Sequence, residues 1–325
     1  MERTWERPKL VVSSCLNKDK CRYNGEDSPC KVLDDLREYI DIIPVCPEMG
    51  IGLKVPRDAI RVVGNENEYK LIDPKSDRDL TEEMIKYSND KIKEFLDDSI
   101  DGFILKGRSP SCGIKDVKIY QTKEKGSMSI KGQGLFAKHI CESFPYSIVE
   151  EDGRLRSFEI RDNFFMKIFT LADFNKVKRD NNIGELVDFH TRNKLLFMTY
   201  APDATKKLGV MVANNEGKKA IEIIKEYGDL LGEMFQKNQK FRRCTHVFEK
   251  AYGYVSDLLY DEEREFFRET LEEYKKGKQA KKTIITLLKG YAIRFDNEYL
   301  LKQTLLEPYP EKLLNLDDSG KGIAR

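Results

Sequence analysis

The sequence lacks long hydrophobic runs and a strong net charge. No apolar stretch in its 325 residues approaches the roughly 18 residues that a membrane-spanning helix needs. The first seven residues, MERTWER, contain no apolar segment of the kind found in secretory signals. Lys and Arg number 57 against 56 Asp and Glu, which gives a net charge of +1. This balance excludes a strongly basic nucleic-acid-binding coat but leaves room for local basic patches. We therefore expect a cytoplasmic protein with no membrane segment.

The sequence contains enough apolar residues to form folded cores, and it contains seven cysteines. Hydrophobic residues make up 40% of the chain and charged residues 35%, which supports folded cores beneath a highly charged surface. The length favours about two domains. The seven cysteines are an odd number in a reducing compartment. They are therefore expected to be ligands, nucleophiles or small core residues rather than disulfides.

The first 150 residues read as an α/β domain with an open parallel sheet. Four short apolar runs, rich in β-branched or aromatic residues, predict buried strands at residues 9–13, 42–45, 102–106 and 146–149. Helical patterns between them cover residues 79–98 and 134–140. Pro44 lies within the second run, and a proline there predicts an edge strand or a bulge.

The remainder reads as an all-α domain. Apolar residues recur every three or four positions, and this spacing predicts helices over residues 183–200, 218–234, 262–274, 280–292 and 298–306. The change of pattern places the boundary at residues 150–153. The predicted domains are therefore residues 1–150 and 151–325.

Three cysteines each follow the carboxyl end of a predicted strand: Cys15, Cys46 and Cys112. In open α/β sheets that edge binds ligands, so the three thiols should converge on one crevice. Three thiolates suit an iron–sulfur cubane with one iron left without a protein ligand, open to substrate as a Lewis acid. The alternative is that they are small buried core residues. Cys21 and Cys30 also lie near the first strand, so Cys21 could replace Cys15 as a ligand or a fourth thiolate could close the cluster. Both are taken as non-ligands, and Cys141 and Cys244 are expected in helix cores.

Two oxygen-bearing residues accompany these cysteines. Glu48 lies two residues after Cys46, and Ser109 lies three before Cys112. A carboxylate in such a crevice can act as a general acid or base, and a hydroxyl can position or relay a proton. Their alternative roles are a helix cap and a turn residue. The shared placement favours a catalytic pair.

These segments resemble the TudS family of thiouracil desulfidases over about residues 8–150. The resemblance rests on VSSCL at 12–16, CRYNG at 21–25, CPE at 46–48, VPR at 55–57, SPSCG at 109–113 and KGQGLFA at 131–137. It implies that Cys15, Cys46 and Cys112 hold a 4Fe-4S cluster. It also matches Glu48 and Ser109 to the family's catalytic acid/base and serine.

The second half resembles the YbgA-like domain found fused to TudS-like domains. The matching stretches are LVDFHTRNK at 186–194, THVFEK at 245–250 and YLLKQ at 299–303. The fusion resembles RudS-type tRNA 4-thiouridine desulfidases. This implies conversion of thiolated uracil, in tRNA, to uracil with release of hydrosulfide and no net electron transfer.

A tRNA substrate needs groups that hold its phosphates. Two basic clusters in the second half are candidates: Lys237, Lys240, Arg242 and Arg243, with Phe241 among them, and Lys275, Lys276, Lys278, Lys281 and Lys282. A solvated charged helix face is the alternative. His190 and His246 are expected to be hydrogen-bonded core residues.

Two other functions remain open. One is a desulfidase of free thiouracil, in which the helical domain serves only to form a homo-oligomer. The other is a non-catalytic iron–sulfur or RNA-binding module, which a fourth cysteine ligand would favour.

Overall fold

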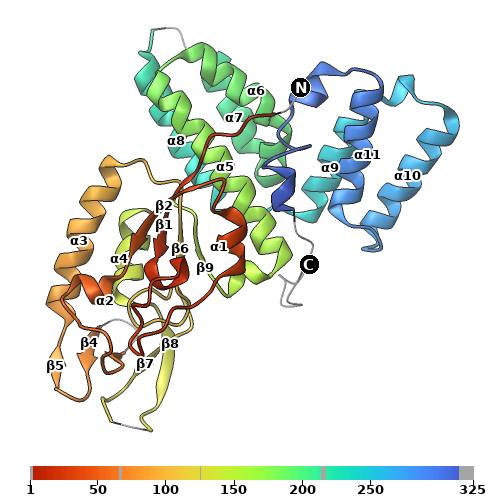
Figure 1. Cartoon of the computed structure of the whole chain (residues 1–325). Helices are drawn as coiled ribbons and strands as arrows, with labels where there is room; N and C mark the ends of the chain where they lie inside the picture. Colours follow the sequence, from red (N-terminus) through yellow and green to blue (C-terminus); the bar gives the residue numbers. More distant parts are fainter. Residues whose placement is uncertain (1–2, 66–67, 125, 214–216, 315–325) are drawn as a thin grey trace. The chain divides into compact units, whose positions relative to one another are not determined.

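The computed structural model describes residues 3–65, 68–124, 126–213 and 217–314. The chain divides into two compact units (Figure 1). One contains the described residues of 6–172 with 313–314, and the other those of 3–5 and 173–312. The division in the chain falls inside helix α5 (Phe158–Asp180). The boundary at residue 150 and the separate roles of two domains stay predictions. None of the described helices has the length and apolar character needed to cross a membrane.

A four-stranded parallel sheet organises the first unit, as the sequence predicted. Its order is β2-β1-β6-β9, with bounds β1 Lys9–Ser13, β2 Asp41–Val45, β6 Gly102–Leu105 and β9 Val149–Glu151. β2 is an edge strand, which explains why Pro44, without an N–H to donate, is tolerated there. β9 starts later than predicted because residues 144–147 form a turn, closed by the Ser147 N–H bonding to the Phe144 carbonyl.

Helices cover both faces of this sheet. On one face, Val11 and Phe103 share a buried core with residues of α3 (Thr81–Asp97) and α4 (Leu135–Ser143). On the other face, Ile168 of α5 lies against Gly102, where an added Cβ would be 3.0 Å from the isoleucine side chain. Coverage on both faces explains why these strands read as continuous apolar runs.

A second sheet was not predicted. It has the order β5-β4-β3-β7-β8 and is antiparallel except for the β3–β7 pair. Its strands are β3 Arg61–Gly64, β4 Tyr69–Asp73, β5 Arg78–Asp79, β7 Val117–Tyr120 and β8 Ser129–Gly132. Val62, Leu71 and Ile119 reach the core shared with the first sheet. The strands are short and alternate apolar with charged residues, so they resemble loops in the sequence.

The second unit is helical, as predicted. Its helices beyond α5 are α6 Ile183–Tyr200, α7 Pro202–Ala213, α8 Ala220–Phe235, α9 Phe241–Tyr252, α10 Asp261–Lys275, α11 Lys281–Arg294 and α12 Glu298–Lys302. α12 ends earlier than predicted because the Gln303 side chain is buried against α6. Its Nε2 donates to the Thr191 carbonyl and its Oε1 accepts the Leu195 N–H. α5 escaped specific prediction because it is apolar around much of its circumference, with Phe164, Phe165 and Met166 all buried in sequence.

The two histidines of interest in this unit differ. His190 is buried and its Nδ1 lies 3.0 Å from the Tyr227 hydroxyl, as expected for a hydrogen-bonded core residue. His246 is exposed on α9, so the prediction that it lies in the core is wrong. It occupies the outward face between the buried Thr245 and Val247.

Candidate active site

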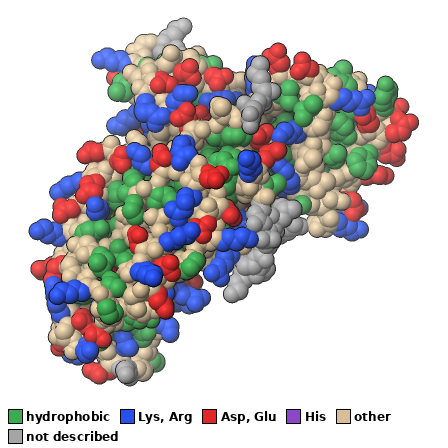
Figure 2. Space-filling model, viewed as in Figure 1, with side chains coloured by type: hydrophobic (Ala, Val, Ile, Leu, Met, Phe, Trp, Pro, Cys, Tyr) green, Lys and Arg blue, Asp and Glu red, His purple; other side chains and the backbone are tan. Residues whose placement is uncertain are grey.

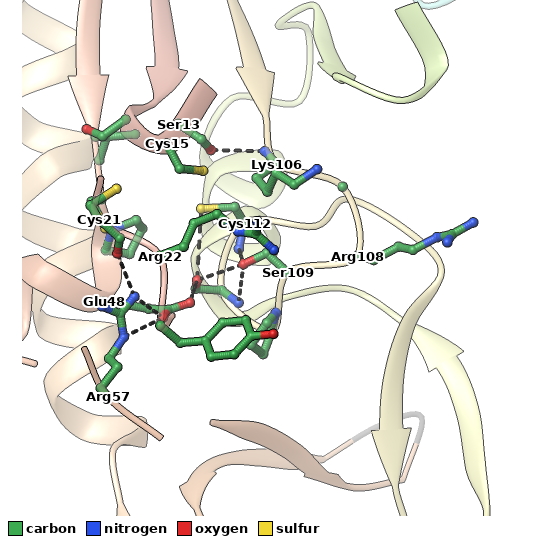
Figure 3. Close-up of a pocket in the computed structure, with 18 residues that line it drawn as sticks. Ser13, Cys15, Cys21, Arg22, Glu48, Arg57, Lys106, Arg108, Ser109 and Cys112 are labelled. Atoms are coloured by element: carbon green, nitrogen blue, oxygen red, sulfur yellow. Dashed lines mark hydrogen bonds and ion pairs between the residues drawn. The ribbon is translucent and has the colours of Figure 1, made fainter. Parts of the chain in front are cut away.

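A cavity of about 340 Å³ lies at the carboxyl edge of the parallel sheet (Figure 3). Its walls come from the segments that follow β1, β2 and β6, three neighbouring strands. Thiols, hydroxyls and charged groups line it, among them Cys15, Cys21, Cys46, Glu48, Arg57, Lys106, Arg108, Ser109, Ser111 and Cys112. The topology therefore brings together segments from three separate parts of the chain.

Each predicted cysteine follows its strand closely. Cys15 lies in a short 3₁₀ turn, Ser14–Asn17, that continues β1. Cys46 caps the single-turn helix α2 (Pro47–Gly50) that continues β2. Cys112 lies in the loop after β6. Because Ser13 pairs with Val45 and Val12 with Ile104 in parallel register, the three segments leave the sheet at the same level.

A fourth thiol, that of Cys21, belongs to the same group. It lines the cavity together with Cys15 and Cys46. In Figure 3 the sulfurs of Cys15, Cys21 and Cys112 face the same space. Cys30 is buried at the start of α1 (Lys31–Leu36) and does not line the cavity. Sequence patterns favoured neither Cys21 nor Cys30 as a ligand, whereas in the structure only Cys21 of the two lines the cavity.

The pKa values of three thiols at the cavity, those of Cys21, Cys46 and Cys112, are raised. Hydrogen bonding with Cys15, together with burial, raises the pKa of the Cys21 thiol to about 11. Hydrogen bonding with Cys21 and burial hold the pKa of Cys46 well above its usual range. Burial raises the pKa of Cys112 to about 12. An electropositive ligand is what would favour their thiolate forms, since metal binding displaces thiol protons.

Glu48 is held from two sides. The Nε and Nη2 atoms of Arg57 donate to its Oε2 at 3.0 and 2.5 Å, and the two side chains are only 8% and 13% exposed. The hydroxyl of Ser111 donates to its other oxygen, Oε1, at 2.8 Å. Pairing and hydrogen bonding of this kind offset the cost of burying a carboxyl group. Arg57 and Ser111 therefore orient Glu48 within the cavity.

Ser109 joins the same network through Ser111. The two hydroxyls lie 3.1 Å apart, and the Ser109 Oγ also accepts the backbone N–H groups of Ser111 and Cys112 at 3.3 and 3.2 Å. Ser109 thus has no direct bond to Glu48 among the contacts described for these residues. The hydroxyl nearest the carboxylate is that of Ser111, which the sequence analysis did not single out.

The Cys112 loop is fixed by distant segments. The N–H groups of Leu135 and Ala137, in the first turn of α4, donate to the carbonyls of Pro110 and Ser111 at 3.1 and 3.0 Å. Gly134 approaches so closely that a Cβ there would be 2.5 Å from the Ser111 carbonyl oxygen. The loop therefore requires glycine at 134.

The end of β9 holds the other side of that loop. Glu151 Oε1 accepts the N–H groups of Ile114 and Lys115 at 2.8 and 3.2 Å. Asp152 accepts the Gly107 N–H at 2.9 Å and pairs with the Lys106 ammonium at 2.7 Å. Burial raises the pKa of Glu151 above its usual value. Residues 151 and 152 thus support the cavity loop, although they fall where the sequence suggested a linker.

Each predicted site residue reaches this cavity: Cys15, Cys46, Glu48, Ser109 and Cys112. Their roles stay predictions. Sequence reasoning missed Arg57 and Ser111, although both belong to motifs that carried the resemblance. Cys141, on α4, lies outside the lining. Arg108 also lines the cavity, but its side chain extends away from the thiols in Figure 3.

Residues 10–152 match the 2-thiouracil desulfurase family. This match ends at Asp152, which supports the cavity loop. Residues 194–310 match a family described as a protein of unknown function, DUF1722. The desulfurase match covers the three cysteine-bearing segments and Glu48 in a single family domain.

Similar proteins match one half of the chain or the other. The uncharacterized protein YbgA of Escherichia coli is 24% identical over 161 residues, 49% of this chain and 95% of its own length. The uncharacterized protein YbbK of Bacillus subtilis is 28% identical over 148 residues, 44% of this chain and 95% of its own. A solved structure of the 4Fe-4S-dependent thiouracil desulfidase TudS shares 27% identity, covering 46% of this chain and 93% of that one, with a TM-score of 0.37.

Proposed function

We propose that the chain is a 4Fe-4S-dependent desulfidase that converts thiolated uracil, as 4-thiouridine in tRNA, to uracil with release of hydrosulfide. The observation that carries the proposal is the convergence of three strand-end thiols, Cys15, Cys46 and Cys112, with Glu48 on one cavity. The desulfurase family match over residues 10–152 supports the reaction class.

The donor set fits an iron–sulfur cluster. Thiolates are the ligands that such clusters use. Thiols from three segments line a cavity, as a cluster of several irons requires. Among the described residues, no three His, Cys, Asp or Glu side chains form a set for a single metal ion. Cys15, Cys46 and Cys112 would hold the cluster. When bound with three cysteines, it supplies a Lewis-acidic iron that suits a soft thiocarbonyl sulfur.

The protein's own groups would handle the proton and the water. Glu48 lies in the cavity as a carboxylate oriented by Arg57, so it can accept a proton from water that attacks the ring carbon. The Ser111 and Ser109 hydroxyls extend from Glu48 as a chain that can position that water or pass the proton. The net reaction exchanges a C=S bond and water for a C=O bond and hydrogen sulfide, with no change of electron count.

The proposal of tRNA as substrate draws on the helical unit. Lys240 and Arg242 lie at the start of α9 and are exposed. Arg243 instead donates to the Tyr200 carbonyl, and Phe241 packs on Tyr274 with ring centroids 4.6 Å apart. In the second cluster, Lys275, Lys276 and Lys278 pair with glutamates. The α9 cluster is therefore the stronger candidate for phosphate contacts, with Phe241 in a packing role.

Nucleoside mass spectrometry tests the proposal. Anaerobically reconstituted protein is incubated with thiolated tRNA, and 4-thiouridine and uridine are quantified before and after. We expect 4-thiouridine to be lost with release of one hydrosulfide for each uridine formed. Glu48→Gln should lower the rate by about 10²–10⁴-fold with its cluster retained. Cys112→Ala should lose both cluster and activity, and Cys141→Ala, outside the cavity, should keep both.

Parallel assays with free 4-thiouracil and 2-thiouracil separate the substrates. Turnover of the free bases without turnover of tRNA would contradict the tRNA proposal and retain a desulfidase. A loaded protein that turns over none of these substrates would leave a non-catalytic iron–sulfur module and overturn the proposal.

A further inference from the structure

We propose that Cys21 is a displaceable fourth ligand to the cluster: its thiolate occupies the iron left free by Cys15, Cys46 and Cys112 until the thiocarbonyl sulfur of the substrate replaces it. This inference rests on the proposed function, because it concerns the same cluster. It assigns Cys21 a role that three-cysteine ligation does not provide.

The first argument is placement. Cys21 lines the cavity together with Cys15, Cys46 and Cys112. A thiol that shares one cavity with the three candidate ligands needs little movement to reach an iron that those ligands hold. The remaining cysteines near or in this unit, Cys30 and Cys141, do not line the cavity.

The second argument is the difference in anchoring. Cys15 and Cys112 are buried, and Cys15, Cys46 and Cys112 follow strands of one sheet. Cys21 lies instead in the loop beyond the Ser14–Asn17 turn and, like Cys46, is partly buried. A thiol on this loop can move away from a metal, whereas Cys15 and Cys46 directly follow the ends of β1 and β2, and the Cys112 loop is bound to α4 and to the end of β9.

The third argument is the support of the loop. The Nη2 atom of Arg57 donates to the Cys21 carbonyl at 3.0 Å and to Glu48 Oε2 at 2.5 Å. The Arg57 N–H donates to the Tyr23 carbonyl at 2.8 Å. One guanidinium thus ties the Cys21 loop to the carboxylate. This keeps the Cys21 thiol close enough to the cavity to return after product leaves.

The exchange is balanced without an oxidant or a reductant. The bond from Cys21 Sγ to iron breaks and a bond from the thiocarbonyl sulfur to iron forms. The released thiolate takes up a proton from solvent. Release of hydrosulfide then lets Cys21 lose that proton and bind again.

Mössbauer spectroscopy of ⁵⁷Fe-loaded protein, without turnover, tests the inference. Wild type should show four irons in similar thiolate environments. Cys21→Ala and Cys21→Ser should keep the cluster but show one iron of the four with a distinct isomer shift. Adding 4-thiouracil to wild type should produce the same kind of single-iron change. Release of iron to a chelator should be about tenfold faster in Cys21→Ala, a difference of about 1.4 kcal/mol.

The controls separate the two proposals. Cys141→Ala should match wild type in spectrum and iron release, and Cys112→Ala should not load. If wild type takes up no cluster, the proposed function fails. If wild type loads and both Cys21 variants match it, the Cys21 inference fails and the proposed function stands. If both Cys21 variants lose the cluster as Cys112→Ala does, Cys21 is a permanent ligand, and the displaceable role is overturned.

Discussion

At the scale of single residues, the ion pair of Glu48 with Arg57 gives the cavity its chemical character. The guanidinium is 8% exposed and makes two bonds to one carboxylate oxygen. Removing one partner of such a pair leaves a buried charge without compensation. Arg57 is therefore a positioning residue that acts through Glu48.

We expect Arg57→Gln to lower kcat for desulfuration by about 10–100-fold, since a small misplacement of a reacting group has effects of this size. KM should change little because Arg57 does not need to touch substrate, and iron content should persist because Cys15, Cys46 and Cys112 still hold the cluster. Steady-state kinetics with iron analysis measures this split. Arg57→Lys should not restore the rate, because lysine lacks the planar fork of donors.

Arg61→Gln serves as the matched control, since Arg61 lies on β3 and stacks on Tyr120 away from the cavity lining. It should keep the wild-type rate. A wild-type kcat for Arg57→Gln, or a loss confined to KM, would contradict the positioning role.

His190 makes the stability of the helical unit sensitive to acid. Burial lowers its pKa to about 4, against about 6.5 in the unfolded chain. On acidification the unfolded state takes up the proton first, so this contribution is present above pH 6.5 and is lost as the pH falls to 4. Urea unfolding measures how far the free energy of unfolding falls between pH 7 and pH 4. This fall should be about 2–3 kcal/mol smaller in His190→Gln than in wild type. His246→Gln, at an exposed position, should follow wild type, and parallel pH curves for all three proteins would refute the assignment.

At the scale of elements, the strand ends set the positions of the thiols, and the surrounding segments set the shape of the loops between them. The Cys112 loop depends on the first turn of α4 and on the end of β9. The closest approach is at Gly134, where backbone faces backbone. Loop geometry at the site is therefore a property of contacts far apart in sequence.

Gly134→Ala should displace the Cys112 loop, because its Cβ would lie 2.5 Å from the Ser111 carbonyl oxygen. We expect weaker cluster retention and a stability loss of about 1–3 kcal/mol. Iron content after desalting and urea unfolding measure the two effects. Gly153→Ala is the control, since its Cβ meets nothing within 4 Å and its φ of −69° suits alanine. Equal iron retention in the two variants would show that the close approach does not fix the loop.

Sequence patterns predicted the strands in which consecutive residues are buried. They missed the features that depend on contacts with residues distant in the sequence. β1 was predicted to its residue bounds because Leu10, Val11 and Val12 are buried on both faces. The strands of the second sheet are two to five residues long and contain few buried positions, so their sequences cannot be separated from loops. Arg57 and Ser111 were missed for a related reason: their roles come from contacts with Glu48 across 9 and 63 residues of chain. Periodicity carries no information about such pairs.

At the scale of the whole molecule, positive and negative side chains are mixed over the surface, and the net charge is close to zero. Figure 2 shows Lys and Arg side chains interspersed with Asp and Glu over the visible face. A long polyanion would therefore need a local group of cations that lack nearby carboxylates. The exposed Lys240 and Arg242 contrast with Lys276 and Lys278, which share Glu273.

Reversing both charges in Lys240→Glu/Arg242→Glu should weaken tRNA binding. It should also reduce the slope of log affinity against log salt by about two, one for each lost phosphate contact. Desulfuration of free 4-thiouracil should be unchanged. Filter binding over a salt series measures the slope. Lys276→Glu/Lys278→Glu carries the same change of charge and should have a smaller effect. A salt-independent affinity in wild type would remove phosphate contacts from the proposal.

The parallel register of β1, β2 and β6 has a practical consequence for redesign. Cys15 and Cys46 directly follow strand ends and the Cys112 loop is bound to α4 and β9, whereas Tyr23 and Arg108 line the same cavity from exposed positions. Libraries restricted to those two outer sites would vary the cavity mouth for bulkier sulfur heterocycles. The sulfur-bearing framework would stay intact during such selection.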